Sequence, residues 1–188
     1  MASKKIAVLV GSLRKESFTR KIALETIALA PASLTCELID ISHLSMYNQD
    51  DDEGSHVPTA WSGFREKMQG MQGVLFFTPE YNRSVPAVLK NAIDVGSRPY
   101  GQSIWSGKPG AIMSVSPGAI GGFGANHHLR QSLVFLDVPC MQQPEAYLGG
   151  VAALLGEDGK VNNDATKKFL QKFIEGYAAW VELAAKSS

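Results

Sequence analysis

The chain has 188 residues, a formal net charge of zero and an apolar fraction of 45%, which suit one globular domain over residues 1–188 with a substantial core. The lack of a basic excess argues against nucleic-acid binding, and we expect neither a signal peptide nor membrane insertion, because no apolar run is long enough. The cysteines Cys36 and Cys140 are far apart and lack zinc-ligand spacing with the histidines, so we expect reduced structural thiols, no metal site and a cytoplasmic protein.

The first predicted element is a strand over residues 6–10, an uninterrupted apolar run typical of a strand buried on both faces. It stops at Gly11, and a helical pattern begins near Phe18 and ends at Pro31. The loop between them carries hydroxyl and basic side chains, which suit an anion at a helix N-terminus. It is neither a Walker loop nor a dinucleotide fingerprint, since it has one glycine and no Gly-Lys-Ser/Thr. A serine-capped helix start with solvated charges is the plainer alternative.

The next elements alternate between strand and helix. Residues 34–40 alternate as a strand does, and the acidic stretch 49–54 is expected to be a solvated loop, because the ligand spacing of a calcium loop is missing. Apolar residues from 57 to 71 recur at helical spacing. A second buried strand covers 73–78, and its loop leads to a helix that opens at Pro86, a favoured first helical position.

The second half of the chain repeats the pattern. It predicts a buried strand over 109–115, a glycine-rich loop over 116–124 and a helix over 129–136. A short last strand over 138–141, an irregular region over 143–156 and a long C-terminal helix from 164 follow. Such alternation implies a parallel sheet with helices on both faces. Crossovers are right-handed, so the loops after the strands gather along one edge, where ligands of open sheets bind. The loops 11–19, 78–86 and 116–124 should therefore meet.

The composition of these three loops suggests a mononucleotide. The first offers donors and positive charge for a phosphate. The other two suit a flat ring, because proline stiffens and glycine thins a backbone that approaches the ring edge. Residues 80–82 add a carboxylate, an aromatic face and an amide. The plainer alternatives are a tight turn for 78–86 and a flexible surface loop for 116–124.

Three stretches closely resemble the NAD(P)H-dependent FMN reductase family, and within it the branch that reduces quinones and chromate. They are Gly11 to Arg14 with Ser17, Thr78 to Asn82 with residues 84–86, and Leu89 to Asp94. The resemblance implies a flavodoxin-like α/β fold for the whole chain, which is a three-layer α/β/α sandwich with a five-stranded parallel sheet in the order 2-1-3-4-5. It also implies non-covalent FMN, with NADPH or NADH as the co-substrate.

By this resemblance, the first loop would surround the FMN phosphate, the second would border the isoalloxazine, and the third would close the site. The residues implied as cofactor-binding are Ser12, Leu13, Arg14, Lys15, Glu16, Ser17, Phe18, Thr19, Pro79, Glu80, Tyr81, Asn82, Arg83, Ser116 and Gly118. Arg14 has the best physical case, because a phosphate favours a charged, bidentate partner. No catalytic side chain is predicted, since the flavin carries the redox chemistry.

The predicted function is an oxidoreductase that passes hydride from NAD(P)H through FMN to a quinone, chromate or another small acceptor, in ping-pong order. A homodimer or homotetramer is also implied. One alternative is a flavodoxin-type electron carrier, which a neutral chain with a Gly-Ser-Leu-Arg loop fits less well. The other is a flavin-free dinucleotide-binding dehydrogenase with Asp40 on the ribose, which the missing glycines disfavour.

Two questions about polar residues stay open at this level. Arg83, His127, Arg130 and Glu145 could serve a subunit interface, the substrate or ordinary surface polarity. Arg83 stands where the family commonly has an aromatic residue, and His127 where a tyrosine can occur. The 2′-phosphate that distinguishes NADPH from NADH could bind to Arg20, Arg83 or Lys15.

Overall fold

The computed structural model describes residues 3–53 and 56–186. Its five parallel strands lie in the order β2-β1-β3-β4-β5. The strands are β1 Lys4–Val10, β2 Leu34–Leu38, β3 Gly73–Thr78, β4 Gly110–Val115 and β5 Tyr147–Leu148. The predicted strand order is thus confirmed.

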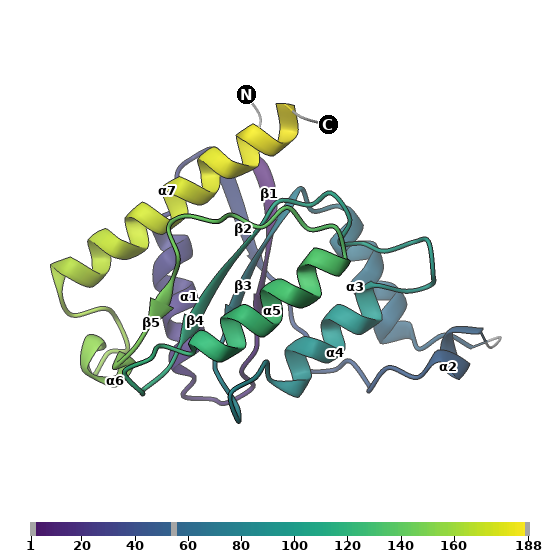
Figure 1. The fold of residues 1–188 in the computed structure, drawn as a ribbon, viewed down its shortest axis with the longest axis horizontal. Coiled ribbons are helices and arrows are strands. Elements are labelled where there is room, and N and C mark those ends of the chain that lie inside the picture. Colours follow the sequence, from purple (N-terminus) through teal and green to yellow (C-terminus); the bar gives the residue numbers. More distant parts are fainter. Residues whose placement is uncertain (1–2, 54–55, 187–188) are drawn as a thin grey trace.

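Helices cover both faces of the sheet (Figure 1). They are α1 Phe18–Ala28, α2 Gln49–Glu53, α3 Thr59–Gln69, α4 Ala87–Gly96, α5 Phe123–Phe135, α6 Val151–Leu154 and α7 Asp164–Lys186. The core residues of α1 and α7 pack on one face, and those of α3, α4 and α5 pack on the other. This is the predicted three-layer sandwich. Among the described residues, no helix combines the length and apolar character needed to cross a bilayer.

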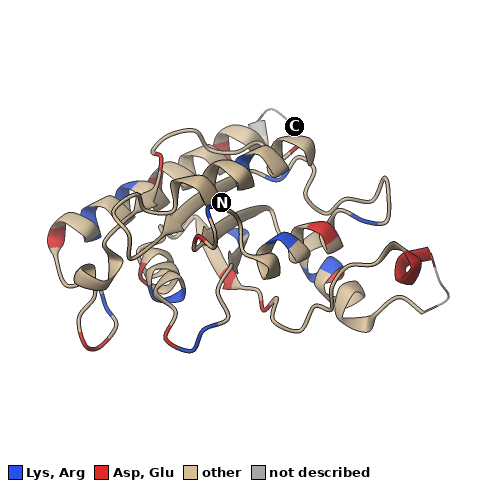
Figure 2. Ribbon diagram, turned by 60° about the horizontal axis from the view of Figure 1, so that its bottom comes forward, with Lys and Arg blue, Asp and Glu red and all other residues tan. Residues whose placement is uncertain are grey.

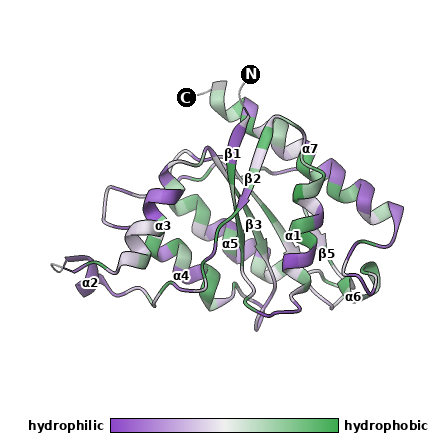
Figure 3. Cartoon of the chain, turned by 180° about the vertical axis from the view of Figure 1, so that it is seen from behind, coloured by the Kyte–Doolittle hydropathy of each residue, from purple (hydrophilic) through white to green (hydrophobic). Residues whose placement is uncertain are grey.

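Side-chain alternation along β1 explains the two cores. Ile6, Val8 and Val10 belong to the core beneath α1 and α7, whereas Ala7 and Leu9 belong to the opposite core. Every residue of the central strands β3 and β4 is buried, as expected for parallel strands covered on both faces. Figure 3 shows β3 as largely hydrophobic, between helices that combine hydrophobic and hydrophilic stretches.

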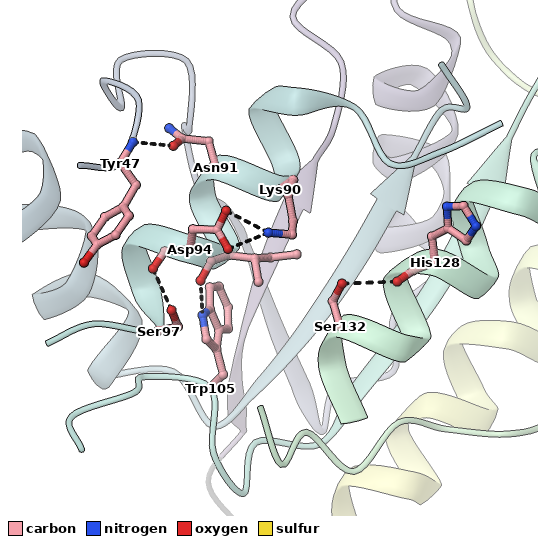
Figure 4. Close-up of polar contacts among 9 residues, drawn as sticks. Tyr47, Lys90, Asn91, Asp94, Ser97, Trp105, His128 and Ser132 are labelled. Atoms are coloured by element: carbon pink, nitrogen blue, oxygen red, sulfur yellow. Dashed lines mark hydrogen bonds and ion pairs between the residues drawn. The ribbon is translucent and has the colours of Figure 1, made fainter. Parts of the chain in front are cut away.

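Helix α4 anchors two segments that are distant in sequence (Figure 4). The buried Asn91 accepts a hydrogen bond from the backbone nitrogen of Tyr47 at 2.8 Å through its Oδ1. Trp105 donates from Nε1 to the carbonyl of Ile93 at 2.9 Å. Buried amide and indole groups need such partners, so α4 holds the segment after β2 and the connection before β4 in place.

The last strand differs from the prediction of residues 138–141. In that segment Cys140 forms only an isolated bridge with Gly110, at the start of β4. Pro139 has no N–H to donate to a ladder. The edge strand is instead β5, which pairs with the end of β4. The region 143–156, expected to be irregular, therefore contains both β5 and α6.

The acidic stretch is also not the solvated loop that was expected. Residues 49–53 form α2, at one edge of the molecule in Figure 2, while Gly54 lies outside the described residues. Within α2, the Asp52 side chain is only 4% exposed and forms a two-point ion pair with Arg65. Arg65 also donates from Nε to the carbonyl of Val95 at 2.9 Å. Acidic composition predicts exposure in general, but a long-range partner removes Asp52 from water.

Several boundaries shift by one or a few residues. Pro86 is the N-cap of α4, with extended backbone, and is not its first helical residue. β2 ends at Leu38 and α1 at Ala28, each before the predicted end. α5 begins at Phe123, so the third loop covers 116–122.

Candidate functional site

The three loops after β1, β3 and β4 meet at one edge of the sheet, as predicted, at the end opposite to the two termini in Figure 1. They enclose a cavity of about 190 Å³. Its wall consists of Ser12, Arg14, Ser17, Phe18, Thr19, Pro79, Glu80, Tyr81, Val115, Ser116 and Pro117. The parallel topology thus gathers residues that are more than a hundred positions apart in the sequence.

The first loop brings a helix N-terminus and one exposed cation to this cavity. Ser17 is the N-cap of α1, and its hydroxyl accepts a hydrogen bond from the backbone nitrogen of Arg20 at 3.1 Å. Glu16 forms an ion pair of 2.6 Å with Lys21, whose hydrogen bond and charge lower the pKa of that carboxyl. Glu16 is thus paired mainly with Lys21, and the exposed Arg14 belongs to the cavity wall.

The second loop ends in a tight turn. Tyr81 and Ser84 exchange two backbone hydrogen bonds, of 3.1 and 3.0 Å. Between them Asn82 and Arg83 both have positive φ, of 51° and 63°, which is the conformation of a type I′ turn. Asn82 and Arg83 do not line the cavity, to which this loop contributes Pro79, Glu80 and Tyr81.

Glu80 joins the second loop to the third. Its Oε2 accepts a hydrogen bond from the backbone nitrogen of Ala125 at 3.0 Å, in the first turn of α5. Its Oε1 lies 3.4 Å from Arg83 Nη1, and the side chain is only 12% exposed. The Glu80 carboxylate thus satisfies a free N–H group at the start of α5 and interacts favourably with the helix dipole. The two segments also pack closely, since a Cβ on Gly124 would lie 2.7 Å from the carbonyl oxygen of Arg83.

The third loop has an exposed middle, residues 117–120, and a tightly packed end at Gly121 and Gly122. Ser116 accepts a hydrogen bond from the nitrogen of Gly118 at 3.1 Å through its hydroxyl. Gly121 and Gly122 both have positive φ, of 67° and 75°. A Cβ on Gly121 would lie 2.6 Å from the carbonyl carbon of Tyr147. Only glycine fits such a backbone and such a contact.

The structure separates the predicted site residues into two groups. Those in the cavity wall are Ser12, Arg14, Ser17, Phe18, Thr19, Pro79, Glu80, Tyr81 and Ser116. Those outside it are Leu13, Lys15, Glu16, Asn82, Arg83 and Gly118, and Leu13 lines a second cavity next to the first. Val115 and Pro117 were missed. Their position on either side of Ser116 was the signal that could have identified them.

The four polar residues left open by the sequence all have partners within the chain, including Arg83 beside Glu80. His127 Nε2 lies 3.0 Å from the hydroxyl of Tyr147, which donates to Glu145 Oε1 at 2.9 Å. Burial, together with the Glu145 carboxylate, raises the pKa of Tyr147 to about 12. Arg130 donates to the side chain of the buried Asn126 at 3.1 Å. Sequence patterns did not indicate Tyr147, which connects two of these residues.

The thiols show no sign of activation. Cys36 and Cys140 are unpaired and partly buried, and burial raises the pKa of each to about 11. Both are therefore neutral thiols near pH 7 and poor nucleophiles. Within residues 3–53 and 56–186, no group of three histidine, cysteine or acidic side chains is placed to hold a metal ion.

Comparison with known proteins agrees with this geometry. Residues 4–153 match the model of the family described as NADPH-dependent FMN reductase. A quinone reductase of Pseudomonas putida is 61% identical over 178 residues, which are 95% of each chain. A 2-hydroxy-1,4-benzoquinone reductase of a Burkholderia species is 46% identical over 94% of this chain and 96% of its own.

A solved structure agrees as well. The flavoenzyme NAD(P)H:(acceptor) oxidoreductase FerB from Paracoccus denitrificans matches with a TM-score of 0.89 and 39% identity, over 96% of this chain and 98% of its own. The flavodoxin-like strand order, the cavity at its ligand-binding edge and relatives of nearly equal length lead to one assignment. The chain belongs to the NADPH-dependent FMN reductase family.

Proposed function

We propose that this protein is an FMN-dependent NAD(P)H:quinone oxidoreductase. The observation that carries the proposal is the cavity in which the three loops meet, in a chain whose relatives are named quinone reductases. NADPH or NADH is the electron donor, and a small quinone is the acceptor. Chromate is a further acceptor in this proposal, since electron transfer to it needs no dedicated side chain.

The residues of the cavity fit FMN at both of its ends. Arg14 provides a guanidinium at the start of α1, and the hydroxyls of Ser12 and Thr19 line the same wall, a set of donors suited to a phosphate. Pro79 and Pro117 provide apolar, rigid surface for a planar ring. When bound, FMN supplies the redox chemistry by accepting hydride from NAD(P)H and delivering it to the acceptor.

The remaining residues of the loops hold this site in shape. Glu80 holds the second loop against the start of α5, the helix that follows the third loop, through its bond to Ala125. The residues on the loops but outside the wall contribute through the backbone in this proposal; they are Leu13, Lys15, Glu16, Asn82, Arg83 and Gly118. Such preorganisation reduces the loop entropy that is lost when FMN binds.

Two coarser expectations belong to the same proposal. The protein works in the cytoplasm, in keeping with its two unpaired cysteines. It forms a homodimer or homotetramer, and exposed apolar side chains such as Val134 and Phe135, at the end of α5, supply surface for it. Analytical ultracentrifugation of the purified protein measures the oligomer directly.

Steady-state kinetics test the proposal. The purified protein alone should oxidise NADPH in the presence of a soluble benzoquinone, and double-reciprocal plots at several quinone concentrations should be parallel, as for ping-pong turnover. A flavodoxin-type carrier would turn over only after a separate reductase is added. A flavin-free dehydrogenase would bind NADH and remain colourless. Either of these results would replace the proposal by the corresponding alternative.

A further inference from the structure

A second cavity lies beside the first, on the other side of the first loop. Its volume is about 270 Å³, and Ser12 belongs to the walls of both cavities. The other lining residues are Val10, Leu13, Arg20, Leu38, Ile39, Asp40 and Ile41. This cavity therefore sits at the carboxyl ends of β1 and β2, next to the strands that carry the proposed flavin site.

Its wall combines an apolar surface with one charge of each sign. Ile39 and Ile41 are buried beneath it, and Arg20 reaches it from the first turn of α1. Asp40 Oδ1 accepts a hydrogen bond from the backbone nitrogen of Ser42 at 2.9 Å. That bond is the main reason why the pKa of Asp40 is lowered, so its carboxylate is ionised near pH 7. His43 Nδ1 lies 3.7 Å from Asp40 Oδ2, on the other side of the carboxylate. A carboxylate has about four acceptor positions, so Asp40 can still accept a hydrogen bond from a ligand.

The other cations near the second cavity either form ion pairs with carboxylates or line the first cavity. Arg14 lines the first cavity, and Lys21 is paired with Glu16. Arg83 is on the turn of the second loop, with Glu80 as its partner. Of the three residues that the sequence left open for a 2′-phosphate, Arg20 is the one in a cavity wall beside the flavin site.

Apolar walls, a guanidinium and a carboxylate match the parts of an adenosine phosphate. The adenine ring needs apolar surface, a phosphate needs a cation with planar donors, and a ribose hydroxyl donates to a carboxylate. In dinucleotide-binding folds an acidic residue binds the ribose 2′-hydroxyl of NAD, and an arginine binds the 2′-phosphate of NADP. Here one residue of each kind faces the same cavity.

We infer that this second cavity binds the adenosine half of the nicotinamide nucleotide. Arg20 binds the 2′-phosphate of NADPH, and Asp40 binds the ribose 2′-hydroxyl of NADH. The inference rests on the proposed function and adds to it the residues that set the preference between NADPH and NADH. Arg20 favours the phosphate, and Asp40 repels it while accepting a hydrogen bond from the unmodified ribose.

The distances across the sheet allow one nucleotide to reach both sites. In the order β2-β1-β3-β4, the ends of β2 and β4 are three strand spacings apart, about 14 Å. A dinucleotide with its nicotinamide over the flavin ring and its adenosine beside β2 spans such a distance in an extended conformation.

Selectivity measurements on the FMN-loaded protein test the inference. We compare the wild type with Arg20→Gln, Arg20→Lys, Asp40→Asn and the control Lys172→Gln, which removes a cation from the exposed side of α7. Arg20→Gln should lower kcat/KM for NADPH about tenfold, as for loss of one charge-assisted hydrogen bond, and leave that for NADH unchanged. Arg20→Lys should recover part of the loss. Asp40→Asn should raise the ratio of NADPH to NADH efficiency.

A binding measurement gives a readout that is independent of turnover. Titration calorimetry with 2′,5′-ADP and with 5′-AMP should show weaker binding of 2′,5′-ADP to Arg20→Gln and unchanged binding of 5′-AMP. If Arg20→Gln reduces NADPH and NADH efficiency equally, or binds 2′,5′-ADP as the wild type does, the assignment of Arg20 is wrong. If the wild type turns over neither nucleotide, the proposed function itself has failed.

Discussion

The Oε2 atom of Glu80 lies 3.0 Å from the backbone nitrogen of Ala125, a contact between a loop after β3 and the first turn of α5. It connects the second loop of the cavity to the helix that directly follows the third loop. Because the side chain is nearly buried, its removal leaves an N–H group and a helix dipole without their partner. Glu80 therefore has a structural task that is independent of any direct contact with the flavin.

Replacing Glu80 by alanine should loosen both loops. We expect the free energy of unfolding to fall by about 1 kcal/mol, the typical effect of losing a helix cap, and FMN to bind more weakly. Glu80→Gln keeps an acceptor oxygen without the charge and should lie between the wild type and the alanine variant. Urea denaturation and quenching of FMN fluorescence measure the two effects. An alanine variant equal to the wild type in both would refute this role.

Arg14 should control the affinity for FMN. Its guanidinium is the cation in the wall at the α1 end of the cavity, so Arg14→Ala leaves the phosphate charge uncompensated. We expect the Kd for FMN to rise about 10- to 100-fold, and the salt dependence of binding to become weaker. Lys172→Gln, on the exposed side of α7, is the matched charge control. Retention of FMN by Arg14→Ala at the wild-type level would contradict the assignment.

The buried ion pair between Asp52 and Arg65 should contribute strongly to stability. Loss of one partner leaves the other charge buried and unpaired, which costs roughly 3–5 kcal/mol. We therefore expect a large decrease in the free energy of unfolding for Asp52→Asn. The exposed neighbour Asp51 is the control, and Asp51→Asn should stay within about 0.5 kcal/mol of the wild type. Equal effects of the two variants in urea denaturation would contradict the pairing.

The thiols should react slowly in the folded protein. Burial raises the pKa of Cys36 and Cys140 from 9.0 to about 11, so at neutral pH each has about a hundredth of the thiolate of an unperturbed thiol. Folding favours the neutral thiols, so this part of the stability is present below pH 9 and is lost as the pH rises through about 11. Alkylation by iodoacetamide should be much faster in urea than in buffer. Fast labelling of native protein at pH 7 would show that the thiols are activated.

Those parts of the fold that depend on local pattern could be predicted from the sequence. The apolar runs 6–10 and 73–78 predicted central strands, because an unbroken run of apolar, β-branched and aromatic residues is typical of a strand that is buried on both faces. The edge strand was missed because Tyr147–Leu148 is only two residues long, too short for any periodicity. The partner of Asp52 was missed because Arg65 is thirteen positions away, and composition does not indicate which carboxylate is buried.

The candidate site shows the same division. The loops could be located because each follows a recognisable strand, and parallel topology brings such loops together. The contact between Glu80 and Ala125 could not be predicted, since the donor to the Glu80 carboxylate is a backbone N–H group 45 positions away, and backbone N–H groups carry no sequence signal. The difference between Arg14 and Arg20, which line different cavities, also depends on the turn at Ser17 and the direction of α1.

The visible absorbance spectrum of the purified protein, recorded without oxygen before and after NADPH is added, tests the central claim most directly. We predict the bands of oxidised flavin, retained after incubation with FMN and gel filtration, and their bleaching by NADPH without any other protein. Flavin bands that persist after both NADPH and NADH would contradict the reductase function. A spectrum without flavin bands would contradict the assignment of the three-loop cavity to FMN.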